Sequence, residues 1–148
     1  MSAANGGQHN LNALLVTCEH GGNRVPANYR SLFQGQDRLL QSHLSYDPGA
    51  LEVAEKIAKA LTAELMVSTF SRLLIDVNRS IGNPRLYSLI TRRAPPAIRQ
   101  RLLEREYLPY RNRAEAWVAG EIARNRRVVH ISCHSFTPRL RGQRRKVD

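Results

Sequence analysis

Two histidines stand just after short apolar runs, in positions where they could bind a metal ion. His20 comes after the run ALLVTC in the segment CEHGGN, and His134 comes after VVHISC in the segment SCHSFTP. If these runs are strands of one sheet, their carboxyl ends deliver both imidazoles to the same edge. Zinc in a hydrolytic enzyme takes three protein ligands, commonly two imidazoles and a carboxylate, and leaves one position for water. We therefore consider a zinc site that needs one further ligand.

Two carboxylates compete for the place of the third ligand. Asp47 opens the first strong helical pattern after His20 and has the expected order along the chain, although taken alone it reads as a helix N-cap. Glu19 is adjacent to His20, and neighbouring residues of a strand point to opposite faces, so both could reach one metal only from an irregular backbone. A lone histidine at a strand end is more often a hydrogen-bonded loop residue, and spacing alone leaves the choice open.

The remaining histidines are expected to be non-ligands. His130 shares a strand face with His134 but lies inside its strand, and His43 precedes the helix without a partner motif. His9 falls in the Gly-rich and Asn-rich start of the chain.

Apolar patterning predicts the strands and the first helix of an α/β fold. Residues 12–18, 64–69, 73–77 and 128–133 are predicted to be extended. Asp47 as N-cap and Pro48 in the first turn predict a helix start ahead of LEVAEKIAKAL, whose apolar residues recur at helical spacing. Strand, helix and strand joined by short links favour a mainly parallel sheet with helices on both faces.

Prolines mark two further helices in the second half. Pro95 and Pro96 can open one helix, and Pro109 is expected to break or kink it before another that contains Trp117. Both are predicted to pack on the sheet.

Composition indicates one small domain. With 148 residues and 42% hydrophobic content, we expect a loose tail at 1–10 and a single domain at 11–148. Cys18 and Cys133 lack paired spacing and are expected to be reduced and buried. No run is long enough for a membrane span, and the start MSAANGGQHN does not resemble a secretory signal, so a soluble cytoplasmic protein is expected.

The net charge of +11 raises the question of a nucleic-acid partner. Much of the excess lies after residue 92, in arginine clusters without the interleaved aromatics of a base-stacking surface. A solvated basic surface is the preferred interpretation. A basic nucleic-acid-binding module remains the alternative from a different functional class.

Four longer segments carry a family resemblance. In their order and separations, LLVTCEHGGNRVP, SYDPGALEVAEKIAKAL, SRLLIDVNRSIGNP and HISCHSFTP resemble the N-formylglutamate amidohydrolase family. The pattern is also similar in outline to zinc carboxypeptidases and to zinc-dependent N-acetylmuramoyl-L-alanine amidases. The resemblance implies a zinc carboxypeptidase-like fold and Zn²⁺ on His20, Asp47 and His134. The amidase arrangement favours Asp47 over Glu19, and Asn23 departs from the carboxypeptidase pattern because an amide is a poor zinc ligand.

The same resemblance implies a substrate and its binding residues. Asn78 and Arg79 of the DVNR segment would hold the carboxylate of a small-molecule substrate, the alternative being that Arg79 only pairs with Asp76. The implied reaction is zinc-dependent hydrolysis of the amide of an N-acylated amino acid. N-formyl-L-glutamate, giving formate and L-glutamate, is the best candidate.

One catalytic part has no matching residue in this sequence. Members of the family are longer, so the chain resembles a truncated member whose C-terminal part is missing, and the resemblance places the proton-transferring glutamate beyond Asp148. Glu19 is the candidate catalytic residue that could substitute for it. A catalytically inactive remnant of the fold is a further alternative, and the oligomeric state is left open.

Overall fold

A central parallel sheet organises the molecule. The structure is a computed structural model that describes residues 12–137, 139–140 and 143–144, so the tail expected at 1–10 lies outside the described residues. The sheet has the strand order β2-β1-β3, with β1 at Asn12–Cys18, β2 at Glu64–Val67 and β3 at Arg127–Ser132. Both neighbours of β1 run parallel to it. The mainly parallel α/β architecture is confirmed.

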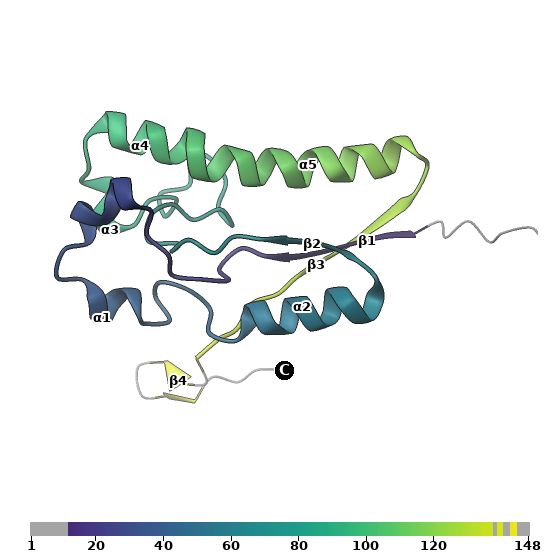
Figure 1. Cartoon of the computed structure of the whole chain (residues 1–148), viewed down its shortest axis with the longest axis horizontal. Coiled ribbons are helices and arrows are strands. Elements are labelled where there is room, and N and C mark those ends of the chain that lie inside the picture. Colours follow the sequence, from purple (N-terminus) through teal and green to yellow (C-terminus); the bar gives the residue numbers. More distant parts are fainter. Residues whose placement is uncertain (1–11, 138, 141–142, 145–148) are drawn as a thin grey trace, which may run out of the picture.

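Helices cover both faces of this sheet. Figure 1 shows α2 (Ala50–Leu61) on one side, and α4 (Pro96–Leu102) and α5 (Leu108–Ala123) on the other. Val16 and Cys18 of β1 pack in one apolar cluster with the alanines of α2. Thr17 alternates to the opposite face, where Tyr110 of α5 is its neighbour. The layers thus follow from the two-residue period of β1.

Helix α2 begins later than the sequence indicated. Its N-cap is Gly49, whose φ of 79° lies in the left-handed region that favours glycine, so the prediction of Asp47 as N-cap is wrong. The Asp47 side chain turns instead toward two histidines and an arginine. Ala50, Ala54 and Ala58 are buried, and their small side chains let the helix lie close to the sheet.

Residues 73–77 do not form the predicted strand. The backbone there follows turns, with the amide of Leu74 bonded to Ser71 O and the amide of Asp76 bonded to Leu86 O. Leu74, Ile75 and Val77 are nevertheless buried in the second apolar cluster, beside the 3₁₀ helix η1 (Ala27–Phe33). A run buried on all sides has the apolar signature of a strand whether or not it pairs, and this explains the error.

The helix pair of the second half is confirmed, but no loop separates its members. Between α4 and α5 the chain forms a π-helical turn, η2, at Leu103–Tyr107. Pro109 falls in the first turn of α5, where its missing N–H is best tolerated. The chain therefore passes from α4 to α5 through the π-helical turn η2, without the break that Pro109 was expected to cause.

The shorter elements lie at the periphery of these layers. Figure 1 shows the short helix α1 (Asp37–Leu40), the short helix α3 (Leu89–Arg92) and the antiparallel pair of β4 (Arg139–Leu140) with β5 (Gln143–Arg144). Cys18 and Cys133 are free thiols and buried, as predicted. Within the described part of the chain, no helix is long and apolar enough to cross a membrane.

Candidate metal centre

His20 is fixed by the glycine loop that follows it. The amide of Gly21 donates to Ser68 O at 3.0 Å, and the amide of Arg24 donates to Thr69 O at 3.1 Å, so the loop lies against the chain that leaves β2. A Cβ on Gly22 would come within 2.3 Å of Thr69 O, which makes glycine necessary there. His20 itself is 4% exposed.

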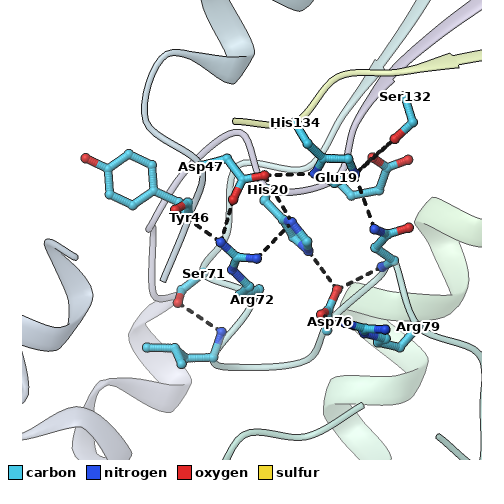
Figure 2. Close-up of polar contacts among 12 residues, drawn as sticks. Glu19, His20, Tyr46, Asp47, Ser71, Arg72, Asp76, Arg79, Ser132 and His134 are labelled. Carbon is cyan, nitrogen blue, oxygen red and sulfur yellow. Dashed lines mark hydrogen bonds and ion pairs between the residues drawn. The ribbon is translucent and has the colours of Figure 1, made fainter. Parts of the chain in front are cut away.

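Asp47 lies beside both of the predicted histidine ligands (Figure 2). Its Oδ2 is 2.8 Å from Nδ1 of His134 and 3.5 Å from Nδ1 of His20. Its other oxygen, Oδ1, accepts a hydrogen bond of 2.5 Å from Arg72 Nη2. The amide of Asp47 also donates to His20 O at 2.9 Å, which couples the two loops through the backbone.

His134 reaches this point from the end of β3. The amide of Cys133 donates to Thr17 O at 2.8 Å and continues the ladder one residue beyond the strand. The ring then directs Nδ1 toward Asp47, and its Nε2 lies 3.1 Å from Ser132 Oγ and 3.2 Å from Asn78 Nδ2.

A carboxylate lies behind each histidine ring. Asp76 Oδ1 is 2.7 Å from Nε2 of His20, and Glu19 Oε2 is 3.5 Å from Nε2 of His134. Both rings therefore direct Nδ1 toward Asp47 and Nε2 toward a second acid. This is the arrangement in which outer carboxylates orient imidazole ligands of metals.

The donor set suits a divalent transition metal. Nitrogen and oxygen donors of His20, Asp47 and His134 all lie within 4.8 Å of one another, and no metal ion is present in the structure. Zinc bonds of about 2.0 to 2.2 Å in tetrahedral geometry put ligand atoms roughly 3.3 Å apart. The observed separations of 2.8 and 3.5 Å lie on either side of that value. Among the described residues, Glu19 does not join this donor set.

The charges at the centre are mutually stabilising. Burial alone would raise the pKa of Asp47, yet hydrogen bonds from His134 and His20 and the charge of Arg72 hold it well below its usual range. Burial likewise opposes charge on His20, but Asp47 and Asp76 outweigh it and raise its pKa. The pKa of Asp76 is lowered because His20 and Arg79 outweigh its burial. The carboxylates are thus ionised and ready to hold a cation.

A cavity of about 460 Å³ opens over the donor atoms. Its wall includes three arginines and few acids, so its field favours an anionic ligand. The charged and polar lining residues other than the three metal candidates are His43, Arg72, Asp76, Asn78, Arg79, Arg85, Ser135 and Thr137.

Arg79 pairs with Asp76 and also lines the cavity. Its Nε lies 3.6 Å from Asp76 Oδ2, and Tyr107 Oη donates to its carbonyl at 2.8 Å. The side chain is still 44% exposed and lines the cavity, so the ion pair does not consume the guanidinium. The adjacent Asn78 lines the same wall.

Arg72 is the main residue that sequence reasoning missed. Its guanidinium donates to Asp47, to His43 O at 2.8 Å and to Tyr46 O at 3.3 Å, and lies 3.2 Å from Nδ1 of His20. Its position four residues before Asp76 in SRLLIDVNR was the available signal. Arg72 therefore holds the Asp47 loop in place.

Of the three histidines expected to be non-ligands, His43 and His130 lie outside the donor set, and His9 lies outside the described residues. His130 is bonded to Thr17 Oγ1 at 2.8 Å. His43 lines the cavity, and its backbone carbonyl accepts a hydrogen bond from Arg72 Nη2.

Comparisons with known proteins identify a family and a similar solved structure. Residues 12–147 match a protein family described as N-formylglutamate amidohydrolase. The structure is also similar to the crystal structure of gene product Atu2144 from Agrobacterium tumefaciens, with a TM-score of 0.81 and 32% sequence identity. That match covers 90% of this chain and 56% of the other, so the chain spans little more than half the length of this relative. A search among curated proteins gave no match.

Proposed function

The chain belongs to the N-formylglutamate amidohydrolase family, and from that premise we propose that it takes part in zinc-dependent hydrolysis of the amide of an N-acylated amino acid. His20, Asp47 and His134 would hold the zinc ion. N-formyl-L-glutamate, cleaved to formate and L-glutamate, is the proposed substrate.

The observation that carries the proposal is the convergence of the metal donors on a cavity with a cationic wall. The Nδ1 atoms of both histidines lie near the Oδ2 atom of Asp47, and all three residues line one cavity. Arg79 lines the same cavity. When bound, zinc would supply Lewis-acid chemistry, polarising the acyl carbonyl and activating water. The cavity thus combines a place for the scissile amide with a place for a carboxylate.

The chain's own residues would bind and orient the substrate. The planar guanidinium of Arg79 can bind a carboxylate with two parallel hydrogen bonds, and the neighbouring Asn78 amide can add a third. Asp76 Oδ2 lies 3.6 Å from Nε of Arg79 and can orient the guanidinium. Holding the carboxylate in this way would fix the acyl carbonyl at the donor cluster, which is the positioning that amide hydrolysis needs.

The proton carrier is not assigned to a cavity residue. Among the described residues lining the cavity, the acids are Asp47 and Asp76, and both are already engaged by histidine and arginine. Glu19 remains a predicted substitute, but it is absent from that lining.

Metal content of the purified protein tests the proposal. We expect about one zinc per chain, and we expect His20→Ala and His134→Ala each to lose it. His43→Ala is the matched control, because its exposed side chain lines the same cavity outside the donor set. Full metal content in both ligand variants would contradict the assignment.

Substrate turnover is tested separately, with the zinc-loaded protein. Release of formate from N-formyl-L-glutamate should exceed that from a formylated amine with no carboxylate, because the amine offers nothing to Arg79. Equal rates on the two compounds would exclude carboxylate recognition. Because the resemblance places the proton-transferring glutamate beyond Asp148, this test uses a chain extended to the length of its relative, and absence of turnover there on a panel of N-acyl amino acids would contradict the hydrolase proposal itself.

A further inference from the structure

Glu19 lies behind His134, away from the cavity. Resting on the metal site proposed above, we propose that Glu19 is a positioning residue for His134, which holds Nε2 so that Nδ1 faces the metal. This role differs from the proton transfer expected of Glu19 from the sequence, and from direct metal ligation.

The contacts of the Glu19 carboxylate carry the inference. Its Oε2 accepts a 2.8 Å hydrogen bond from Ser132 Oγ, and the same oxygen lies 3.5 Å from Nε2 of His134. Ser132 Oγ is itself 3.1 Å from that nitrogen. Figure 2 shows the His134 ring between Asp47 on one side and Glu19 with Ser132 on the other. The acid thus contacts the nitrogen that does not face the donor cluster.

The placement of Glu19 follows from the turn after β1. β1 ends at Cys18, and Glu19 and His20 follow it in a turn that sends their side chains in different directions. His20 points to the donor cluster, whereas Glu19 points toward the α5 side, where Thr17 and Tyr110 are its neighbours. Glu19 is 6% exposed and does not line the cavity, so it has no path to a substrate there.

Asp76 provides an internal comparison. Asp76 is hydrogen-bonded to Nε2 of His20 at 2.7 Å, whereas Glu19 lies 3.5 Å from Nε2 of His134 and shares Ser132 Oγ with it as a hydrogen-bond partner. An acid behind an imidazole holds the proton on that nitrogen, leaves the other nitrogen free as a ligand and stops rotation of the ring. Each histidine therefore has an acid on its Nε2 side, in direct contact at His20 and together with Ser132 at His134.

The first experiment compares metal affinities, using competition with a chromophoric chelator. Loss of an outer-shell partner typically weakens metal binding by about 10- to 100-fold, and we expect Glu19→Gln to fall in that range. Glu121→Gln is the control, because Glu121 is a similarly buried acid of α5 that pairs with Arg124 and Arg126 just after the helix. It should leave the metal affinity within about twofold while testing for general effects on folding.

A second variant keeps the test decisive if Glu19→Gln folds poorly. Ser132 is exposed, so Ser132→Ala should fold, and it removes the hydrogen bond that fixes the Glu19 carboxylate. Ser132→Ala should also weaken metal binding, but by a smaller factor than Glu19→Gln. Unchanged affinity in both variants would overturn the positioning role.

The other roles of Glu19 give different results. If Glu19 carries protons, Glu19→Gln should keep the metal affinity and lower kcat by about a hundredfold or more. If Glu19 is a ligand, the variant should lose the metal entirely. Either result overturns the proposal.

A readout on the metal-free protein separates this inference from the proposed function. Nitrogen-15 chemical shifts of His134 report which ring nitrogen carries the proton. Asp47, 2.8 Å from Nδ1, competes with the Glu19 side for that proton, so Glu19→Gln should shift the population from Nε2–H toward Nδ1–H. An unchanged population overturns the positioning role whether or not the protein binds zinc. Failure of the wild-type chain to bind zinc contradicts the proposed function alone.

Discussion

Nε2 of His20 lies 2.7 Å from Oδ1 of Asp76, although 56 residues separate them in the sequence. The same Asp76 oxygen accepts a 3.0 Å hydrogen bond from the backbone amide of Asn78. This local hydrogen bond fixes the position of the carboxylate independently of His20. Both side chains are buried. The orientation of the His20 ring is therefore determined by a residue of the DVNR segment.

Replacing this acid should weaken the metal centre. Asp76→Asn keeps the shape but removes the charge that holds the His20 proton, so we expect about 10- to 100-fold weaker zinc binding. Competition titration measures the effect. Asp37→Asn, at an exposed acid of α1, serves as the control and should change nothing. An Asp76 variant with wild-type affinity would show that the hydrogen bond does not orient the ring.

Arg79→Lys should impair substrate binding more than a surface substitution does. Lysine keeps the charge but cannot form the two-pronged contact with a carboxylate. A loss of one to two hydrogen bonds to a charged group corresponds to roughly a ten- to hundredfold lower kcat/KM, most of it in KM. Arg113→Lys is the comparison, since Arg113 pairs with Glu64 on the surface. Equal kcat/KM values for the two variants would exclude the binding role of Arg79.

The stability of the metal-free protein should have a maximum at mildly acidic pH. The pKa of His20 is raised above 6.5. The stability that His20 contributes is therefore complete below pH 6.5 and is lost as the pH rises through its folded-state pKa. The pKa values of Asp47 and Asp76 are lowered from 3.8. The stability that these two carboxylates contribute is therefore complete above pH 3.8 and is lost as the pH falls through their folded pKa values.

Urea unfolding of chelator-treated protein between pH 3 and 9 measures this profile. His20, Asp47 and Asp76 together should contribute most to the free energy of unfolding between about pH 4 and 6.5. His20→Ala should remove the decline on the alkaline side. A decline of the same size in that variant would mean that another group causes it.

Two glycines should respond oppositely to alanine. Gly22→Ala would place a Cβ 2.3 Å from Thr69 O, so the loop must shift, and overpacking of this kind costs about 1 to 3 kcal/mol. Gly120 lies inside α5 with its nearest neighbour at 3.6 Å, the flexible end of Arg124, so Gly120→Ala should stabilise by roughly 0.5 to 1 kcal/mol. Thermal unfolding of the two variants checks both signs. A stable Gly22→Ala protein would show that this loop can move.

The strands β1 and β3 and the helix α2 were predictable because their patterns reflect burial by neighbouring layers. The structure of residues 73–77 could not be predicted in this way, because this apolar run is buried without pairing to another strand. The start of α2 was misplaced for a related reason. Asp47 is a good N-cap by propensity, but the contacts with Arg72 and His134 compete for its carboxylate and prevail.

The candidate site divides in the same way. His20 and His134 could be located because strand ends of a parallel sheet meet at one edge. The partners behind the rings could not be located, because they depend on the direction in which a side chain leaves the backbone. Glu19 was identified as important, but its position on the far side of His134 required the tertiary structure.

The π-helical turn at Leu103–Tyr107 has a consequence for insertions and deletions. A turn with i→i+5 bonds contains one residue more than an α-helical turn, so deleting one residue there would restore regular spacing. It would also rotate all of α5 by about 100° relative to α4. Tyr110 would then leave the sheet face where it meets Glu19, and Glu121 would leave its buried position. The number of residues in this turn therefore determines which side of α5 faces the sheet, so a one-residue deletion should be tolerated far less well than any single substitution within it.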